Sequence, residues 1–184
     1  MKKMMFNDKY GLTQAVLEKR KTMTRRIVPQ SVLDHYLCNA EDPTIIDAAR
    51  YEIGDVVAIA QAYKELYPNA DFRMVGDEFM TESVGWKNKM FVRADLMPHH
   101  IKITNIKVER LQDIANEDCM REGVHMRTEQ HPRQEFEPEY TFGKGDYHAK
   151  YPIAAFAALI DKVSGNGTWE RNPFVFAYEF ELID

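Results

Sequence analysis

The segment Lys19–Arg26 carries five basic side chains among its eight residues, in a chain whose formal net charge is −5. The other three residues are two threonines and a methionine. The segment is too short to be a basic tail, and it lies between a helical pattern and the apolar pair Ile27–Val28. A local group of cations on an acidic protein indicates a site for an anion, which would be a phosphate, a carboxylate or a nucleic-acid backbone.

Two elements must position this segment. The spacing of apolar residues predicts a helix from about Tyr10 to Lys19, and the pattern of Thr22–Val28 favours a strand. On a regular strand Thr24 and Arg26 share one face, whereas Lys21 would point to the other. Lys21 can therefore join Thr24 only if it lies in the turn before the strand.

Four further strands and two further helices are expected. The helices are a short one that begins near Asn116 as N-cap and stops at Gly123, and an amphipathic one over Pro152–Val163. In one strand, Ile101–Leu111, the alternation of apolar residues changes phase near Asn105, where a bulge or bend is predicted. The expected strands are Met4–Phe6, Val56–Gln61, Ile101–Leu111 and Phe174–Leu182.

The order of these elements does not follow strict βαβ alternation. It predicts an α+β fold: a small mixed or antiparallel β-barrel with flanking helices, forming one domain over residues 1–184. Two polar segments without clear periodicity, approximately 63–90 and 125–151, are interpreted as loop-rich insertions.

Composition narrows the class of protein. A chain that is 45% hydrophobic and 29% charged is typical of a globular protein with a real core. The acidic balance argues against a general nucleic-acid-coating protein but permits a local basic cleft. Two cysteines without C-x-x-C spacing favour a reducing setting. The N-terminal residues lack the apolar core of a signal peptide and no apolar run approaches a membrane span, so a cytoplasmic location without membrane contact is expected.

Several blocks, taken in order, resemble the ASCH domain family of PUA-like β-barrels, which is associated with RNA and nucleotide metabolism. The family's signature, G-x-K-x-x-T-x-R, lies between helix and strand. Lys21, Thr24 and Arg26 match it, while Lys19 stands where the family has glycine. The remaining matching blocks are Gly54–Asp55, Ile106–Ile114, Glu122–Gly123 and Tyr178–Phe180, and Gly167–Pro173 resembles a phage and bacterial subgroup of unassigned role.

One branch of that family hydrolyses N4-acetylcytidine, and the resemblance implies catalytic roles for Lys21, Thr24 and Glu122. A threonine hydroxyl becomes a nucleophile when a base takes its proton, and a desolvated lysine among cations can be that base. A glutamate can pass a proton to the leaving amine. The resemblance further implies substrate-binding roles for Arg20, Arg25 and Arg26.

The function expected from this resemblance is binding of a nucleoside or nucleic acid, RNA more than DNA, in a basic cleft, with hydrolysis of an N-acylated cytidine-type base. The alternatives are a non-catalytic RNA- or DNA-binding module, or a phage or mobile-element accessory protein that binds a host partner. The residues alone also allow a plainer interpretation, in which Lys21, Thr24 and Arg26 form a solvated strand edge and Glu122 lies on a helix surface.

Other candidate groups carry weaker signals. No cofactor is expected, and no metal, because His99, His100, Cys119, His125 and His131 lack the spacing of metal ligands. The aromatic side chains of the last strand are assigned to the core. Trp86 and Trp169 lie in polar contexts, where each could stack on a base or form a packed lid.

Overall fold

A five-stranded sheet forms the centre of the computed structural model, which describes residues 1–36, 43–127, 139–145 and 147–184. Its strand order is β1-β3-β6-β9-β2. Neighbouring strands are antiparallel except for β1 and β3, which are parallel. The strands are β1 (Lys2–Met4), β2 (Met23–Ile27), β3 (Val56–Ile59), β6 (His100–Arg110) and β9 (Phe174–Leu182).

The sheet remains open, because β1 and β2 are its two edges and no backbone ladder joins them within the described residues. The predicted α+β class with a mostly antiparallel sheet is confirmed, but the sheet does not close into a barrel. One side chain crosses the gap: Arg26 of β2 donates from Nη2 to the carbonyl of Met5, just after β1, at 2.6 Å. The edges are thus linked by a side chain rather than by the ladder.

The two longest strands, β6 and β9, are neighbours in the middle of the sheet. Their register shifts between Ile103 and Asn105, so the predicted bulge near Asn105 is confirmed. The shift lets Ile101 and Ile103 on one side of it and Ile106 on the other all be buried. The side chains of β9 from Val175 to Tyr178, together with Phe180, are buried, which confirms that its aromatic residues pack in the core.

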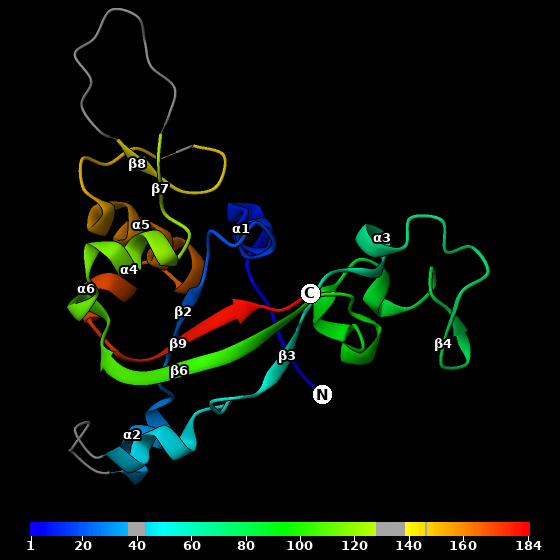
Figure 1. Ribbon diagram of the computed structural model, residues 1–184, viewed down its shortest axis with the longest axis horizontal. Helices are drawn as coiled ribbons and strands as arrows, with labels where there is room; N and C mark the ends of the chain where they lie inside the picture. The colour runs from blue at the N-terminus through cyan, green and yellow to red at the C-terminus, as the bar shows by residue number, and fades with distance from the viewer. Residues whose placement is uncertain (37–42, 128–138, 146) are drawn as a thin grey trace, which may run out of the picture.

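Helices lie on both sides of the long strands (Figure 1). In that view α4, α5 and α6 lie above β6 and β9, and α2 lies below them. Pro152 stands at the start of α5, and Gly165 follows its end with φ +104°, as the sequence predicts. The α-helices outside the insertions are α1 (Leu12–Leu17), α2 (Gln30–His35), α4 (Asn116–Arg121), α5 (Pro152–Ser164) and α6 (Thr168–Arg171). Short 3-10 turns are η1 (Asp8–Tyr10), η2 (Pro43–Ala48) and η6 (Leu111–Asp113).

Several details differ from the sequence-based expectation. The first strand is Lys2–Met4 rather than Met4–Phe6, and the first α-helix is Leu12–Leu17 rather than about Tyr10–Lys19. Ala115, not Asn116, occupies the N-cap of α4, and Asn116 is the first helical residue. The helix α6 was not predicted. It has only four residues, between a glycine-rich turn and a turn that contains proline, and four residues are too few to show a helical periodicity of apolar side chains.

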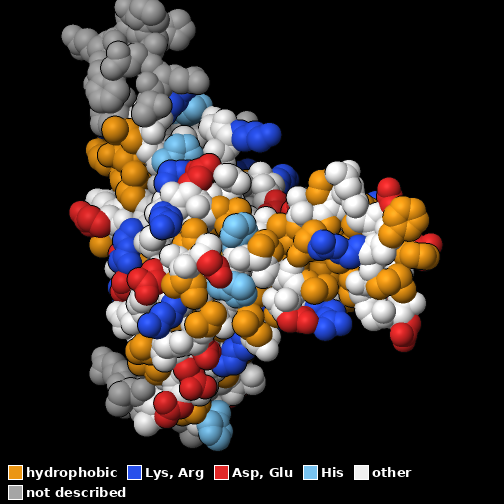
Figure 2. All heavy atoms as spheres, turned by 45° about the vertical axis from the view of Figure 1, so that its right-hand side comes forward, with side chains coloured by type: hydrophobic (Ala, Val, Ile, Leu, Met, Phe, Trp, Pro, Cys, Tyr) orange, Lys and Arg blue, Asp and Glu red, His pale blue; other side chains and the backbone are white. Residues whose placement is uncertain are grey.

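The first insertion is a lobe with its own small core (Figures 1 and 2). It contains α3 (Tyr63–Leu66), the two-stranded β4 (Met74–Val75) and β5 (Glu78–Phe79), and the 3-10 turns η3 (Val84–Trp86), η4 (Lys89–Phe91) and η5 (Ala94–Leu96). The buried residues of this core are Ala58, Ala60, Tyr63, Ala70, Met80, Val92 and Met97.

The second insertion begins with β7 (His125–Met126), which pairs with β8 (Tyr140–Thr141) farther along the insertion. Much of the predicted loop between them lies outside the described residues, as do Cys38 and His131. Within the described ranges, no helix has the length and apolar character needed to cross a bilayer.

Candidate functional site

The turn after α1 directs the basic segment. Lys19 adopts the left-handed conformation with φ 59°, at the position where the motif that it resembles has glycine. The amide of Lys19 donates to Val16 and that of Arg20 to Ala15, which is the hydrogen-bond pattern of a Schellman motif. Holding a lysine in this conformation costs about 1 kcal/mol relative to glycine. Lys21 then lies in the turn before β2, where the alternation of side chains along the strand does not fix the direction of its side chain.

The Lys21 ammonium is buried and fully hydrogen-bonded. Its Nζ atom donates to Glu122 Oε2, to the Glu122 carbonyl and to the Met23 carbonyl, each at 2.7 Å. The side chains of Lys21 and Glu122 are only 2% and 5% exposed. Three acceptors match the three protons of an ammonium group. The structure therefore brings two of the predicted catalytic residues into direct contact.

Glycine at position 123 makes room for this contact. Gly123 follows Glu122 with φ +108°, and an added Cβ would lie 3.0 Å from Leu12 Cδ2 and 3.7 Å from Lys21 Cδ. The end of α4 can thus approach the lysine stem closely, and the Glu122 backbone carbonyl can accept from the Lys21 ammonium.

Arg25 holds the other oxygen of the Glu122 carboxylate. Its side chain is completely buried, and Nη1 donates to Glu122 Oε1 at 3.2 Å. Nε and Nη2 donate to Glu109 Oε1 at 2.8 and 2.6 Å, and Nη2 also reaches Asp118 Oδ2 at 3.2 Å. Across the sheet Arg25 pairs with Ala177, whose small side chain leaves space for the guanidinium. Arg25 was predicted to bind substrate, but its donors are directed at these three carboxylates.

These residues belong to one ion-pair network that joins the turn after α1 with β2, β6, α4 and β9. The network holds four cations and four carboxylates, so it is formally neutral. Its members are Lys21, Arg25, Lys107, Arg121, Glu109, Asp118, Glu122 and Glu179.

Thr24 lies on β2 opposite Tyr178 of β9 and is 5% exposed. In the part of the chain that the structure describes, its hydroxyl makes no hydrogen bond, including none with Lys21. The oxygen is not one of the fully enclosed polar atoms that lack a partner, so it keeps some access to solvent. A threonine hydroxyl in this state is free to bond to, or react with, a ligand.

The two remaining predicted residues differ in their surroundings. Arg26 is two residues from Thr24 on the same face of β2, partly buried, and bonded to the Met5 carbonyl. Arg20 is exposed and forms an ion pair with Glu18 at the surface. The structure thus places Arg26, but not Arg20, beside Thr24.

Burial governs the electrostatics of the site. It lowers the pKa of Lys21, while the charge of Glu122 and its hydrogen bond act in the opposite direction. Burial also lowers the pKa of Arg26. For Arg25, burial acts to lower the pKa, but the charges of Glu122 and Glu109 outweigh it and the pKa is raised. The site therefore penalises its cations unless a carboxylate neutralises them.

The network itself was not predicted from the sequence. Glu109 and Lys107 alternate with apolar residues on a strand, a pattern that is typical of a solvated face. Asp118 was assigned to the first turn of a helix, where an acid suits the helix dipole. A useful signal would have been Ala177, a small residue in the middle of an aromatic-rich strand. It is buried, and its cross-strand partners are the charged residues Arg25 and Lys107.

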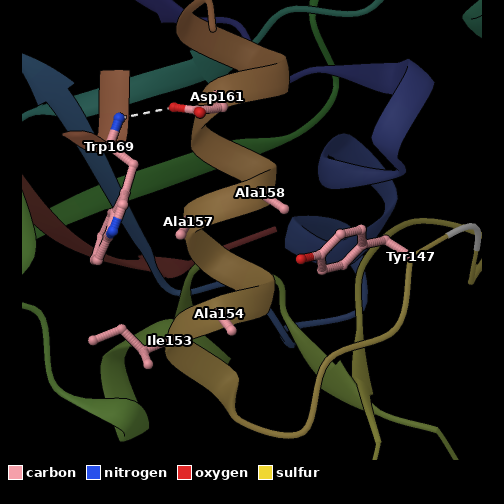
Figure 3. Close-up of a pocket in the computed structure, with 7 residues that line it drawn as sticks. All are labelled: Tyr147, Ile153, Ala154, Ala157, Ala158, Asp161 and Trp169. Carbon is pink, nitrogen blue, oxygen red and sulfur yellow. Dashed lines mark hydrogen bonds between the residues drawn. The ribbon is translucent and has the colours of Figure 1, made fainter. Parts of the chain in front are cut away.

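A separate apolar groove of about 500 Å³ runs along α5 (Figure 3). Ala154, Ala157 and Ala158 of the helix lie between Trp169 and Tyr147, and Asp161 accepts a hydrogen bond from the Trp169 amide at 2.8 Å. The Trp169 ring packs edge-on against Phe156, with centroids 6.1 Å apart. None of the predicted site residues lines this groove.

No cluster of three or more histidine, cysteine or acidic side chains in the described ranges is arranged to hold a metal ion. Among the predicted metal candidates, Cys119 is fully buried, and burial raises the pKa of its thiol to about 12. His100 contacts the carboxylate of Asp184 at 2.7 Å instead.

Comparison of the chain with protein-family models, with curated proteins and with solved structures finds no match. Function is therefore inferred from the site and from the resemblance of its motif.

Proposed function

We propose that the protein binds a nucleoside at the face of β2 that carries Thr24 and Arg26, and hydrolyses an acyl group from the exocyclic amine of a cytidine-type base. The observation that carries the proposal is the buried contact between Lys21 and Glu122, with the buried Thr24 three residues after Lys21 in the chain. A buried lysine beside a carboxylate can exchange a proton with it, and a buried hydroxyl nearby can attack a carbonyl. The PUA-like character of the fold belongs to the same proposal.

The reaction requires one proton transfer within the 2.7 Å contact, which yields a neutral Lys21 amine and a protonated Glu122. The amine must then exchange its bond to the Met23 carbonyl for the hydroxyl of Thr24, the next residue. Thr24 Oγ1 attacks the acyl carbon while Lys21 takes the hydroxyl proton. Arg26 holds a polar edge of the substrate.

Collapse of the intermediate breaks the bond between the acyl carbon and the exocyclic nitrogen, and Glu122 gives its proton to the leaving amine. The site now holds a threonine ester, a Lys21 ammonium and a Glu122 carboxylate. Water attacks the ester, its proton goes to Glu122, and the Lys21 proton returns to Thr24 as the carboxylic acid leaves. Arg25 acts as a positioning residue, because it holds the second oxygen of Glu122.

Release of cytidine from N4-acetylcytidine by the purified protein tests this proposal. Thr24→Val keeps the shape of the side chain but removes the hydroxyl, and should lower kcat/KM at least about a thousandfold. Thr24→Ser, which keeps a hydroxyl, should retain measurable turnover. Lys21→Arg preserves a cation that cannot act as a base, so it should also be inactive.

Turnover of the wild type no higher than that of Thr24→Val would refute the reaction. If the same preparation instead bound oligonucleotides with an affinity that falls steeply with salt, the non-catalytic nucleic-acid-binding module would be the better description.

A further inference from the structure

Two arginines beside the site stand outside the neutral ion-pair network. Arg26 and Arg50 have no ion pair with any carboxylate in the described residues, whereas the four cations of the network each contact at least one. Neither guanidinium is therefore neutralised by direct contact with a carboxylate of the described residues.

Arg26 has donors to spare. A guanidinium carries five N–H groups, and among the described residues the Arg26 side chain makes one hydrogen bond, from Nη2 to the Met5 carbonyl. Its position two residues from Thr24 on one strand places it on the face that carries the hydroxyl.

Arg50 comes to the same place from a distant part of the chain. Its backbone N–H donates to the Tyr178 hydroxyl at 3.2 Å, and Tyr178 is the cross-strand partner of Thr24. The exposed Arg50 guanidinium lies 5.6 Å from the centre of the Tyr51 ring. Tyr51 in turn packs edge-on against Tyr178, with ring centroids 5.3 Å apart. The aromatic pair thus fixes the base of Arg50 next to the site and leaves its charged end in solvent.

Both guanidinium groups would gain from a bound anion. Burial is the main reason that the pKa of Arg26 is lowered, and the positive charge of Arg50 lowers it further. An anion held by both groups would offset the cost of burying the Arg26 charge and the repulsion between the two cations.

We propose that Arg26 and Arg50 bind the phosphate of the substrate, so that the preferred ligand is a nucleoside monophosphate rather than the free nucleoside. This inference rests on the proposed function, because it assumes a nucleoside at Thr24. Phosphate is the anionic group that nucleosides carry in cells, and paired guanidinium groups match its charge and its oxygen geometry. Tyr51 and Tyr178 position Arg50 for this contact.

The test compares N4-acetylcytidine with its 5′-monophosphate as substrates of the wild type, Arg50→Gln and Arg73→Gln. Arg73 is a matched control, since it is also an exposed arginine over a tyrosine ring, 4.3 Å from that of Tyr67, but lies in the insertion. The ratio of kcat/KM for the monophosphate to that for the nucleoside should fall about tenfold in Arg50→Gln, the value of one lost charged hydrogen bond. It should be unchanged in Arg73→Gln.

Calorimetric titration with cytidine 5′-monophosphate, cytidine and inorganic phosphate provides a readout that needs no turnover. The monophosphate should bind about tenfold more tightly than cytidine, and Arg50→Gln should remove that difference. Turnover of both substrates with a ratio that Arg50→Gln leaves unchanged would overturn the phosphate site while the proposed reaction stands. Tight, Arg50-dependent binding of the monophosphate without any turnover would uphold the phosphate site and refute the reaction. Equal binding of cytidine and its monophosphate would overturn the phosphate site.

Discussion

Replacing Lys21 by methionine tests whether the buried ion pair has the energetic weight that its geometry implies. Methionine preserves most of the apolar stem but removes the ammonium. Three acceptors, two of them belonging to Glu122, lose a donor at 2.7 Å. The carboxylate of Glu122 would remain buried with only the Arg25 contact at 3.2 Å.

Removing one partner of a buried pair leaves the other charge uncompensated, which costs about 3–5 kcal/mol. That is a large part of the total stability of about 5–15 kcal/mol that is usual for a folded domain. Lys107→Met is the matched control, because Lys107 belongs to the same network but its side chain is 42% exposed. Its loss should cost about 1 kcal/mol or less.

Urea unfolding followed by the fluorescence of Trp86 and Trp169 measures these free energies. The double variant Lys21→Met/Glu122→Gln removes both charges, so it should lose about 2 kcal/mol less than the sum of its single variants. Additive losses, or a cost for Lys21→Met no greater than for Lys107→Met, would refute the reasoning. The network would then be a solvated arrangement with no buried pair at its centre.

Three further predictions concern neighbouring features. Gly123→Ala forces a side chain into the left-handed region 3.0 Å from Leu12 Cδ2, so it should lower the free energy of unfolding by about 1–2 kcal/mol, measured in urea. The hydrogen bond from Arg121 holds the pKa of Glu179 below its ordinary value of 4.5, so this pair stabilises the fold above pH 4.5 and the stabilisation is lost as the pH falls through the folded-state pKa. In Glu179→Gln the free energy of unfolding should therefore fall less steeply as the pH is lowered below 4.5. An unchanged pH dependence would contradict this prediction. Cys119, with a pKa of about 12, should resist iodoacetamide at pH 8 and react only after unfolding in urea, as followed by mass spectrometry of its peptide; rapid labelling of the folded protein would contradict its burial.

The sequence predicts an element of the fold well where the local pattern of apolar residues shows which side chains are buried. The alternation in Phe174–Leu182 and the change of phase near Asn105 both describe which face of a strand meets the core, and both are found in the structure. The class of the fold follows from such segments. Closure of the sheet does not, because the approach of β1 to β2 depends on curvature that no local pattern encodes.

The candidate site divides in the same way. The family resemblance implies that Lys21 and Glu122 share a site, and the two residues contact each other across 101 positions of sequence. The carboxylates around Arg25 come from β6, α4 and the end of α4, and their spacing in sequence contains nothing about that meeting. The position of Arg50 could not be predicted from the sequence either, because it is set by the hydrogen bond from its backbone N–H to the Tyr178 hydroxyl.

The contact between Arg26 and the Met5 carbonyl has a consequence for how easily the two edge strands can separate. If backbone hydrogen bonds closed the sheet, several of them would have to break in concert before β1 and β2 could move apart. Within the described residues one guanidinium links these strands instead, and a change of its rotamer releases it on the timescale of side-chain motion. Because the same side chain is proposed to bind the substrate phosphate, a ligand that takes up the Arg26 guanidinium would loosen the contact between the two edges of the sheet.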